Sequence, residues 1–135
     1  MNYWLVKSEP SEYSWEDLLK NGEEIWDGIR NFQARNYLRE MKTGDLVLFY
    51  HSGKTKEIIG IAEVTEEAFP DQADSEQKGW VSIRIKPKIS IKNPLTLEKI
   101  KNDGQLSNLL LLKQSRLSVM PVEKPQFDHI VKLTS

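Results

Sequence analysis

The residues best suited to chemistry in this chain stand where large aromatic side chains are mixed with polar ones. Three stretches have this character: residues 4–10, 26–35 and 49–52. Each places a flat aromatic surface beside hydroxyl, carboxylate, amide or guanidinium groups. Such a combination can stack on a flat polar ligand and hydrogen-bond to its edge, and a nucleotide is one ligand of this kind.

The middle stretch carries Trp26 directly before a predicted turn at Asp27-Gly28. Arg30 and Asn31 follow, and Asn31 can cap a helix whose first N–H groups would be unpaired. An aromatic wall beside these donors suits a ligand with an anionic backbone. The alternative is that Trp26 belongs to the core and Asn31 only caps the helix.

The last stretch is predicted to end a strand, on which side chains alternate between two faces. Tyr50 and Ser52 then share one face, and Phe49 and His51 share the other. Tyr50 is a candidate for stacking on a base, with Ser52 as its hydroxyl partner. The alternative is a core strand in which Phe49 packs and His51 finds one hydrogen-bond partner.

The first stretch ends a predicted strand with a cation, a hydroxyl and a carboxylate in Lys7-Ser8-Glu9. A strand end that opens into a loop is a common place for a site. The alternative interpretation is a surface turn.

Basic side chains recur at every second position in Arg84, Lys86 and Lys88, which sets them about 6.6 Å apart along one side of a strand. Such a row could hold a phosphate backbone, or it could be solubilising charge that guards an edge strand. An acidic set on the other side of the predicted hairpin is interpreted as a solvated face that repels phosphate: Glu57, Glu63, Glu66, Glu67, Asp71, Asp74 and Glu76.

Composition narrows the classes of function. Lys and Arg number 19 against 20 Asp and Glu, and this balance argues against a non-specific nucleic-acid coat. The absence of cysteine removes disulfides, thiol catalysis and thiolate metal sites, and two histidines make a His-rich metal site improbable. We therefore expect no metal and no cofactor. No targeting signal or membrane span is visible, so the expected location is cytoplasmic, or nuclear in a eukaryote.

Catalytic motifs are missing as well. The chain has no G-x-S-x-G nucleophile elbow, no phosphate-binding loop and no zinc-binding helix motif. An enzyme that uses Ser8 or His51 on a nucleotide-like substrate stays open as an alternative.

The pattern of elements indicates one domain over residues 1–135. Strands are predicted at 2–8, 24–28, 46–51, 57–65, 79–93 and 116–121. Helices are predicted after the caps Ser14, Asn31, Thr96 and Ser107, and a terminal helix begins near Pro125. Gly44 is expected to end the second helix. This order predicts an α+β fold, either a small barrel or a curved sheet with helices around it.

Two stretches make specific predictions about the core. Alternation in the fifth predicted strand places five residues in the core: Val81, Ile83, Ile85, Ile89 and Ile91. Pro87 interrupts this strand and predicts an edge or a bulge there. The terminal helix is expected to bury Phe127, Ile130 and Val131.

Taken together, several of these stretches resemble the EVE domain family nearly end to end. They are Tyr3 to Pro10, Tyr13-Ser14 with Asp17-Leu18, Trp26 to Asn36, Met41 to Asp45, Phe49 to Ser52, Gly60 to Val64, Phe69 to Asp71 and Arg116 to Val122. The resemblance implies a PUA-like fold, a small mixed β-barrel flanked by helices. It also implies a non-catalytic reader of a modified cytosine or adenine, chiefly in DNA.

Residues and resemblance together give a hypothesis in which a nucleotide is flipped into an aromatic cage. Trp26 and Tyr50 form its walls, the base edge is read by Ser8, Glu9, Asn31 and Ser52, and His51 and Arg116 complete the rim. The backbone is held by Lys7, Arg30, Arg35, Arg84, Lys86 and Lys88. Trp26→Ala is expected to abolish the preference for a modified base and to leave the fold largely intact.

The expected partner is a nucleic acid that carries a modified base, with no membrane partner. A nuclease or restriction component that acts downstream is compatible with such a reader. An RNA-binding module of the same class, acting on tRNA or rRNA, is the first alternative. The sequence leaves the oligomeric state open.

Overall fold

The computed structural model describes all residues 1–135 and contains six strands and five α-helices. The strands are β1 (Tyr3–Ser8), β2 (Glu24–Trp26), β3 (Leu46–His51), β4 (Glu57–Pro70), β5 (Val81–Thr96) and β6 (Val119–Val122). The α-helices are α1 (Trp15–Asn21), α2 (Phe32–Glu40), α3 (Leu97–Lys101), α4 (Leu110–Lys113) and α5 (Lys124–Thr134), with a 3₁₀ turn at Gly104–Leu106. None of these helices is long and apolar enough to cross a membrane.

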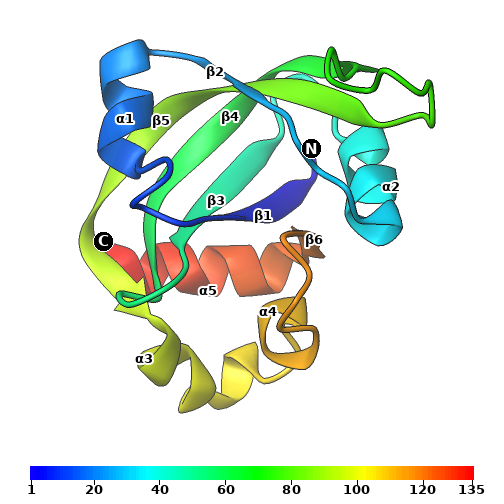
Figure 1. The fold of residues 1–135 in the computed structure, drawn as a ribbon. Coiled ribbons are helices and arrows are strands. Elements are labelled where there is room, and N and C mark those ends of the chain that lie inside the picture. The colour runs from blue at the N-terminus through cyan, green and yellow to red at the C-terminus, as the bar shows by residue number, and fades with distance from the viewer.

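All six strands join one sheet in the order β2-β5-β4-β3-β1-β6. Only β1 and β3 run parallel, and every other neighbouring pair is antiparallel. The edge strands β2 and β6 do not pair, so the sheet stays open. The α+β class is thus confirmed, with a curved sheet in place of a closed barrel. Figure 1 shows α5 running across the sheet, with α1 and α2 at its sides and α3 and α4 beyond α5.

Several helices begin or end at the capping residues that the sequence predicts. Ser14 and Asp17 make a reciprocal capping box at the start of α1, and Gly22 ends that helix with a left-handed φ of 76°. The Asn31 side chain accepts the Ala34 N–H at the start of α2. Thr96 caps α3 in the same way.

Some predicted boundaries are wrong. The helix α2 ends at Glu40 because Met41 already has extended backbone, so Gly44 serves the turn before β3 instead. No side chain caps α4, which begins after Leu109, so Ser107 is not its cap. The strands β4 and β5 run five and three residues further than expected, to Pro70 and Thr96, because they pair as one long hairpin.

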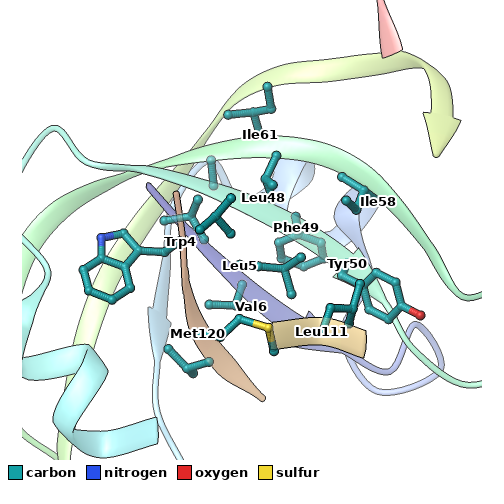
Figure 2. Packing of buried hydrophobic residues seen from close by; sticks show 14 of the residues in the cluster. Trp4, Leu5, Val6, Leu48, Phe49, Tyr50, Ile58, Ile61, Leu111 and Met120 are labelled. Atoms are coloured by element: carbon teal, nitrogen blue, oxygen red, sulfur yellow. The ribbon is translucent and has the colours of Figure 1, made fainter. Parts of the chain in front are cut away.

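The core is a single cluster between the sheet and the helices, and Figure 2 shows part of it around Leu5, Leu48 and Phe49. A register shift opposite Pro87 confirms the predicted bulge. Bulges bend a strand, and Ile89 just beyond this one is 51% exposed, against the prediction of a core position. On α5 Phe127 and Ile130 are buried as predicted, whereas Val131 lies on the solvent side, 37% exposed.

The parallel pairing of β1 with β3 positions the residues that matter for function. It places Lys7 beside Tyr50 and Ser8 beside His51 at the ends of the two strands. Paired residues in neighbouring strands point to the same face, and the next pair points to the opposite face. The Lys7–Tyr50 pair and the Ser8–His51 pair therefore serve different sides of the sheet.

Candidate nucleic-acid interface

A cavity of about 430 Å³ opens where β1 ends, between the loop before α1 and strand β2. We call it the acidic cavity. Its lining consists of Lys7, Ser8, Glu9, Glu12, Tyr13, Glu24, Ile25, Trp26, Asp27 and Ile29. Four carboxylates face one lysine here, so the cavity disfavours phosphate and suits a ligand that donates hydrogen bonds.

Two aromatic side chains contribute to the acidic cavity. Trp26 is only 8% exposed, and its ring packs edge-on against Phe49 with centroids 5.5 Å apart. The half-buried Tyr13 meets Trp26 at 6.0 Å and 75°, and its hydroxyl accepts a hydrogen bond from Asn21. Burial raises the pKa of Tyr13. The aromatic partner of Trp26 in this cavity is therefore Tyr13.

The burial of Trp26 changes the expectation for Trp26→Ala. Removing a large ring from this packed position leaves a cavity next to Phe49, at a cost of about 3–5 kcal/mol of folding stability. The fold would therefore not stay largely intact, and Tyr13 is the better residue with which to test the aromatic wall.

The loop between β1 and α1 holds Tyr13 and Glu9 in place through short-range hydrogen bonds. The Ser8 hydroxyl donates to the Tyr13 carbonyl at 2.5 Å. The Glu9 carboxylate accepts the Ser11 N–H, and the Glu9 carbonyl accepts the N–H groups of Glu12 and Tyr13. Ser8 therefore positions the wall of the acidic cavity, and its hydroxyl proton is already engaged.

A second cavity of about 600 Å³ has the opposite charge. It lies between the ends of β1 and β3, the β3–β4 turn, α3, α4 and the segment before β6, and we call it the lysine cavity. Its lining consists of Lys7, Tyr50, Ser52, Gly53, Lys56, Leu97, Lys101, Leu111, Ser115 and Ser118. Three lysines and no carboxylate line it, and Lys7 belongs to both cavities.

Strand alternation separates Tyr50 from Trp26. The ring of Trp26 packs on Phe49, and Tyr50 is the next residue of β3, so Tyr50 points to the other face. The sequence-based arrangement, in which Trp26 and Tyr50 wall a single pocket, is therefore corrected. Trp26, Ser8 and Glu9 line the acidic cavity, whereas Tyr50 and Ser52 line the lysine cavity.

His51 holds the start of α1. Its Nε2 accepts the Trp15 N–H at 3.0 Å, and this amide is one of the N–H groups that a helix start leaves unpaired. Burial lowers the pKa of His51, and the nearby carboxylates of Glu57, Glu9 and Glu16 offset only part of this shift. His51 lines neither cavity, and its accepting nitrogen serves the backbone.

Asn31 and Arg116 lie together but away from both cavities. They share a groove of about 330 Å³ with Gln33 and with the segment from Lys113 to Leu117. The Asn31 side-chain oxygen accepts the Ala34 N–H, which is its capping role. Neither residue meets Trp26 in one pocket, in contrast to the sequence-based arrangement.

Arg30 and Arg35 gather beside two aromatic rings. Phe32, 62% exposed, stacks on Trp80 with centroids 5.0 Å apart. The Arg35 guanidinium lies 4.9 Å from the Phe32 centroid, and Arg30 lies 5.4 Å from that of Trp80 and pairs with Asp71 at 3.0 Å. These cations stay accessible at the N-terminal end of α2.

The basic row on β5 is largely neutralised by neighbouring glutamates. Arg84 pairs with Glu23 at 3.2 Å and with Glu66 at 3.0 Å, and Lys88 pairs with Glu63 at 3.0 Å. Lys86 is exposed and has no ion-pair partner. The strand is not an edge here, because β2 and β4 flank Ile83 to Ile85. This geometry favours a solvated, ion-paired face over a phosphate-binding row.

Two of the acidic residues expected on a solvated face are structural. Asp71 is 4% exposed and accepts N–H groups from Gly28 and Ala73. Burial raises the pKa of Asp71, but these amides and the Arg30 guanidinium outweigh it and hold the pKa below its usual value. Asp74 accepts the backbone N–H groups of Lys78, Gly79 and Trp80. Both carboxylates therefore shape the loop at 71–80.

Sequence reasoning missed part of the acidic cavity, namely Glu12, Tyr13, Glu24 and Asp27. Tyr13 could have been found from its position directly before the Ser14 cap, because the short loop between β1 and that cap keeps it near the end of β1. For Glu24 and Asp27 the signal was their position on either side of Trp26. None of these carboxylates can be assigned to a cavity before the pairing of β2 with β5 is known.

The chain is similar to known proteins over almost its whole length. The model of the EVE domain family matches residues 2–133, and the chain belongs to this family. Thymocyte nuclear protein 1 of Gallus gallus is 33% identical, over 97% of this chain and 68% of that protein. The solved structure of Rpa0253 from Rhodopseudomonas palustris has a TM-score of 0.94 at 41% identity, covering 99% of this chain and 93% of that one.

A solved relative carries a ligand. The human THYN1 protein in complex with 5-methylcytosine containing DNA is 30% identical, with a TM-score of 0.92 over 100% of this chain and 98% of that one. A more distant structure, the YTH domain of Zygosaccharomyces rouxii MRB1 in complex with N6-methyladenosine RNA, shares the fold at a TM-score of 0.64 and 17% identity, over 99% and 86% of the two chains.

Proposed function

We propose that this protein reads a modified base, foremost a modified cytosine in DNA, flipped into the acidic cavity. The observation that carries the proposal is the combination of Tyr13 and Trp26 with four carboxylates in one cavity of about 430 Å³. The rings supply stacking of about 1–3 kcal/mol, comparable to the few kcal/mol lost when a base leaves the helix. The carboxylates supply the polar recognition that must be added to it.

Carboxylates select for a base with an exocyclic amino group. They accept hydrogen bonds only, and the amino group of cytosine or adenine is a donor that aspartate or glutamate can accept. Thymine and uracil present a carbonyl at the same position and would face unfavourable acceptor–acceptor contacts. The human THYN1 complex with 5-methylcytosine containing DNA supports the choice of cytosine.

Binding without catalysis fits the same residues. The Ser8 hydroxyl donates to the Tyr13 carbonyl, and His51 Nε2 accepts the Trp15 N–H. The two side chains are neighbours across β1 and β3, yet each is engaged with a different backbone group. We therefore assign them to positioning the cavity wall, and we expect no turnover of modified nucleosides.

The deciding experiment compares three oligonucleotides that differ at one position: cytosine, 5-methylcytosine and thymine. We expect 5-methylcytosine to bind tighter than cytosine, since one buried methyl contributes about 0.8 kcal/mol, and discrimination should not exceed about 200-fold. Thymine carries the same methyl and should bind worse than 5-methylcytosine. Equal affinity for 5-methylcytosine and thymine, measured by fluorescence anisotropy, would overturn the role of the carboxylates.

Matched RNA oligonucleotides form the second arm of this experiment. A protein that contacts the 2′-hydroxyl binds RNA tighter than DNA of the same sequence. We expect the DNA oligonucleotide to bind tighter than the matched RNA. Tighter binding of the RNA would assign the module to RNA recognition. A downstream nuclease or restriction partner, and a cytoplasmic or nuclear location, remain predictions from the sequence.

A further inference from the structure

The lysine cavity gathers three lysines in a lining that contains no carboxylate. Four lysines elsewhere in the chain, Lys42, Lys78, Lys88 and Lys124, each lie within 4 Å of a carboxylate. Lys7, Lys56 and Lys101 line one cavity without any carboxylate partner. In a protein with net charge −1, three lysines without an ion-pair partner around one cavity form a local site for an anion.

Neutral donors complete this site. The hydroxyls of Ser52, Ser115, Ser118 and Tyr50 belong to residues that line the cavity. Figure 2 shows the Tyr50 hydroxyl pointing away from the packed cluster, past Leu111. It has no hydrogen-bond partner within the protein, and no polar side-chain atom without a partner is fully buried, so it opens to the cavity. Hydroxyl and ammonium donors together suit the several acceptor oxygens of a phosphate.

Contacts with backbone groups hold Lys7 and the backbone of Lys56. The Lys7 ammonium donates to the Ser115 carbonyl at 2.8 Å, and the Lys7 N–H donates to the Ser118 carbonyl at 2.9 Å. The Lys56 carbonyl accepts the Leu97 N–H, which ties the β3–β4 turn to the start of α3. The Lys7 side chain and the backbone that carries Lys56 are therefore held in place within the protein.

We infer that the lysine cavity binds a phosphate group. The source of that phosphate rests on the proposed function: Lys7 lines both cavities, so a nucleotide whose base enters the acidic cavity can place a backbone phosphate on the lysine side. A free phosphate-bearing small molecule presents the same chemistry. The carboxylates of the acidic cavity disfavour phosphate there, whereas the lysine cavity, which shares Lys7 with it, favours the anionic part of the ligand.

The test uses two double variants with the same charge change on the same two elements. Lys56→Gln with Lys101→Gln removes two ammonium groups that line the cavity. Lys54→Gln with Lys99→Gln removes one from the same turn and one from the same helix, α3, where neither residue lines the cavity. Inorganic phosphate is titrated into each protein and followed by amide NMR shifts, and each protein is also titrated with 5-methyl-2′-deoxycytidine and its 5′-monophosphate.

We expect phosphate to shift the amides of Ser52, Gly53 and Ser118 in the wild type and in the Lys54/Lys99 control. The Lys56/Lys101 variant should lose at least tenfold in affinity for phosphate and should no longer favour the monophosphate over the nucleoside. Equal phosphate affinity in the two variants, or shifts confined to other residues, would overturn the inference.

Oligonucleotide binding identifies the source of the phosphate. If the nucleic-acid backbone supplies it, the Lys56/Lys101 variant should flatten the slope of log K against log salt by about 0.7–0.9, the contribution of one phosphate contact. An unchanged slope with lost phosphate binding assigns the cavity to a free phosphate ligand. Should cytosine, 5-methylcytosine and thymine bind alike, the proposed function fails while the phosphate titration still decides this inference.

Discussion

The acidic cavity and the lysine cavity lie on either side of the ends of β1 and β3, and they differ in charge far more than in size. One has four carboxylates and one lysine in about 430 Å³; the other has three lysines and no carboxylate in about 600 Å³. The two parts of a nucleotide match these cavities, because an amino group of the base donates hydrogen bonds to carboxylates and the phosphate is an anion that lysines attract. Neighbouring residues of β1 and β3 thus contribute to two chemically opposite sites.

This separation depends on very few residues. Lys7 borders both cavities, and the Glu9 carboxylate lies against Gly53, which lines the lysine cavity. The Glu9 carboxylate stays out of the lysine cavity because it is turned toward the loop before α1, where it accepts the Ser11 N–H. Substitutions on one side should change one kind of recognition and leave the other in place.

The largest expected effect comes from Tyr13→Ala, which removes the aromatic partner of Trp26 from the acidic cavity. Loss of stacking worth about 1–3 kcal/mol should lower affinity for a 5-methylcytosine oligonucleotide by about 5- to 150-fold. Anisotropy titrations at several salt concentrations should show an unchanged salt slope, because no phosphate contact is lost.

Tyr37→Ala is the matched control for this change. Tyr37 is half-buried and packs against Trp4, but it lines neither cavity. A loss of DNA affinity as large as that of Tyr13→Ala would show that general destabilisation, and not stacking, is the cause.

A smaller effect is expected from Gly53→Ala at the boundary between the cavities. Gly53 has a φ of +83°, where a side chain costs about 1–2 kcal/mol, and its Cβ would lie 2.5 Å from Glu9 Oε2. The change should therefore lower the free energy of unfolding and also displace Glu9 from the acidic cavity. Denaturant titration measures the first effect and discrimination between cytosine and 5-methylcytosine the second.

Gly22→Ala is the control that separates the cost of backbone strain from the cost of the contact between the added Cβ and Glu9. Gly22 has a similar φ of +76° with no atom within 4 Å of the added Cβ, so it reports backbone strain alone. The excess destabilisation of Gly53→Ala over Gly22→Ala should disappear when Glu9 is also changed to alanine. Persistence of that excess without the Glu9 carboxylate would contradict the boundary role of Glu9.

The smallest effect is a pH dependence set by His51, which holds the α1 end of the acidic cavity. Its pKa in the folded protein lies below its usual value near 6.5, so on acidification the unfolded chain takes up a proton before the folded one does. The free energy of unfolding should therefore fall as pH drops from about 6.5 toward the folded pKa, by at most about 1.4 kcal/mol per pH unit for one proton.

His51→Gln keeps an oxygen acceptor for the Trp15 N–H and removes the titration. Unfolding measured between pH 7.5 and 5.5 should show a weaker pH dependence in the variant than in the wild type. Identical pH profiles would show that His51 does not contribute to acid sensitivity.

The sequence by itself determined the local structure and the family. Capping chemistry at Ser14, Asn31 and Thr96 and the left-handed Gly22 depends on neighbouring residues only, so it can be predicted without the fold. The same holds for the opposite faces of Phe49 and Tyr50, which follow from strand alternation.

Only the tertiary structure decided which of those faces meets Trp26. Alternation fixes the relation between neighbours but not the side of the sheet on which a distant strand packs. The pairing of β2 with β5 brings Trp26 onto Phe49. Tyr50 is left facing α3, α4 and three lysines, of which Lys7 and Lys101 come from distant parts of the chain. Long-range strand pairing, which no short stretch of residues encodes, therefore made two cavities where the sequence had suggested one.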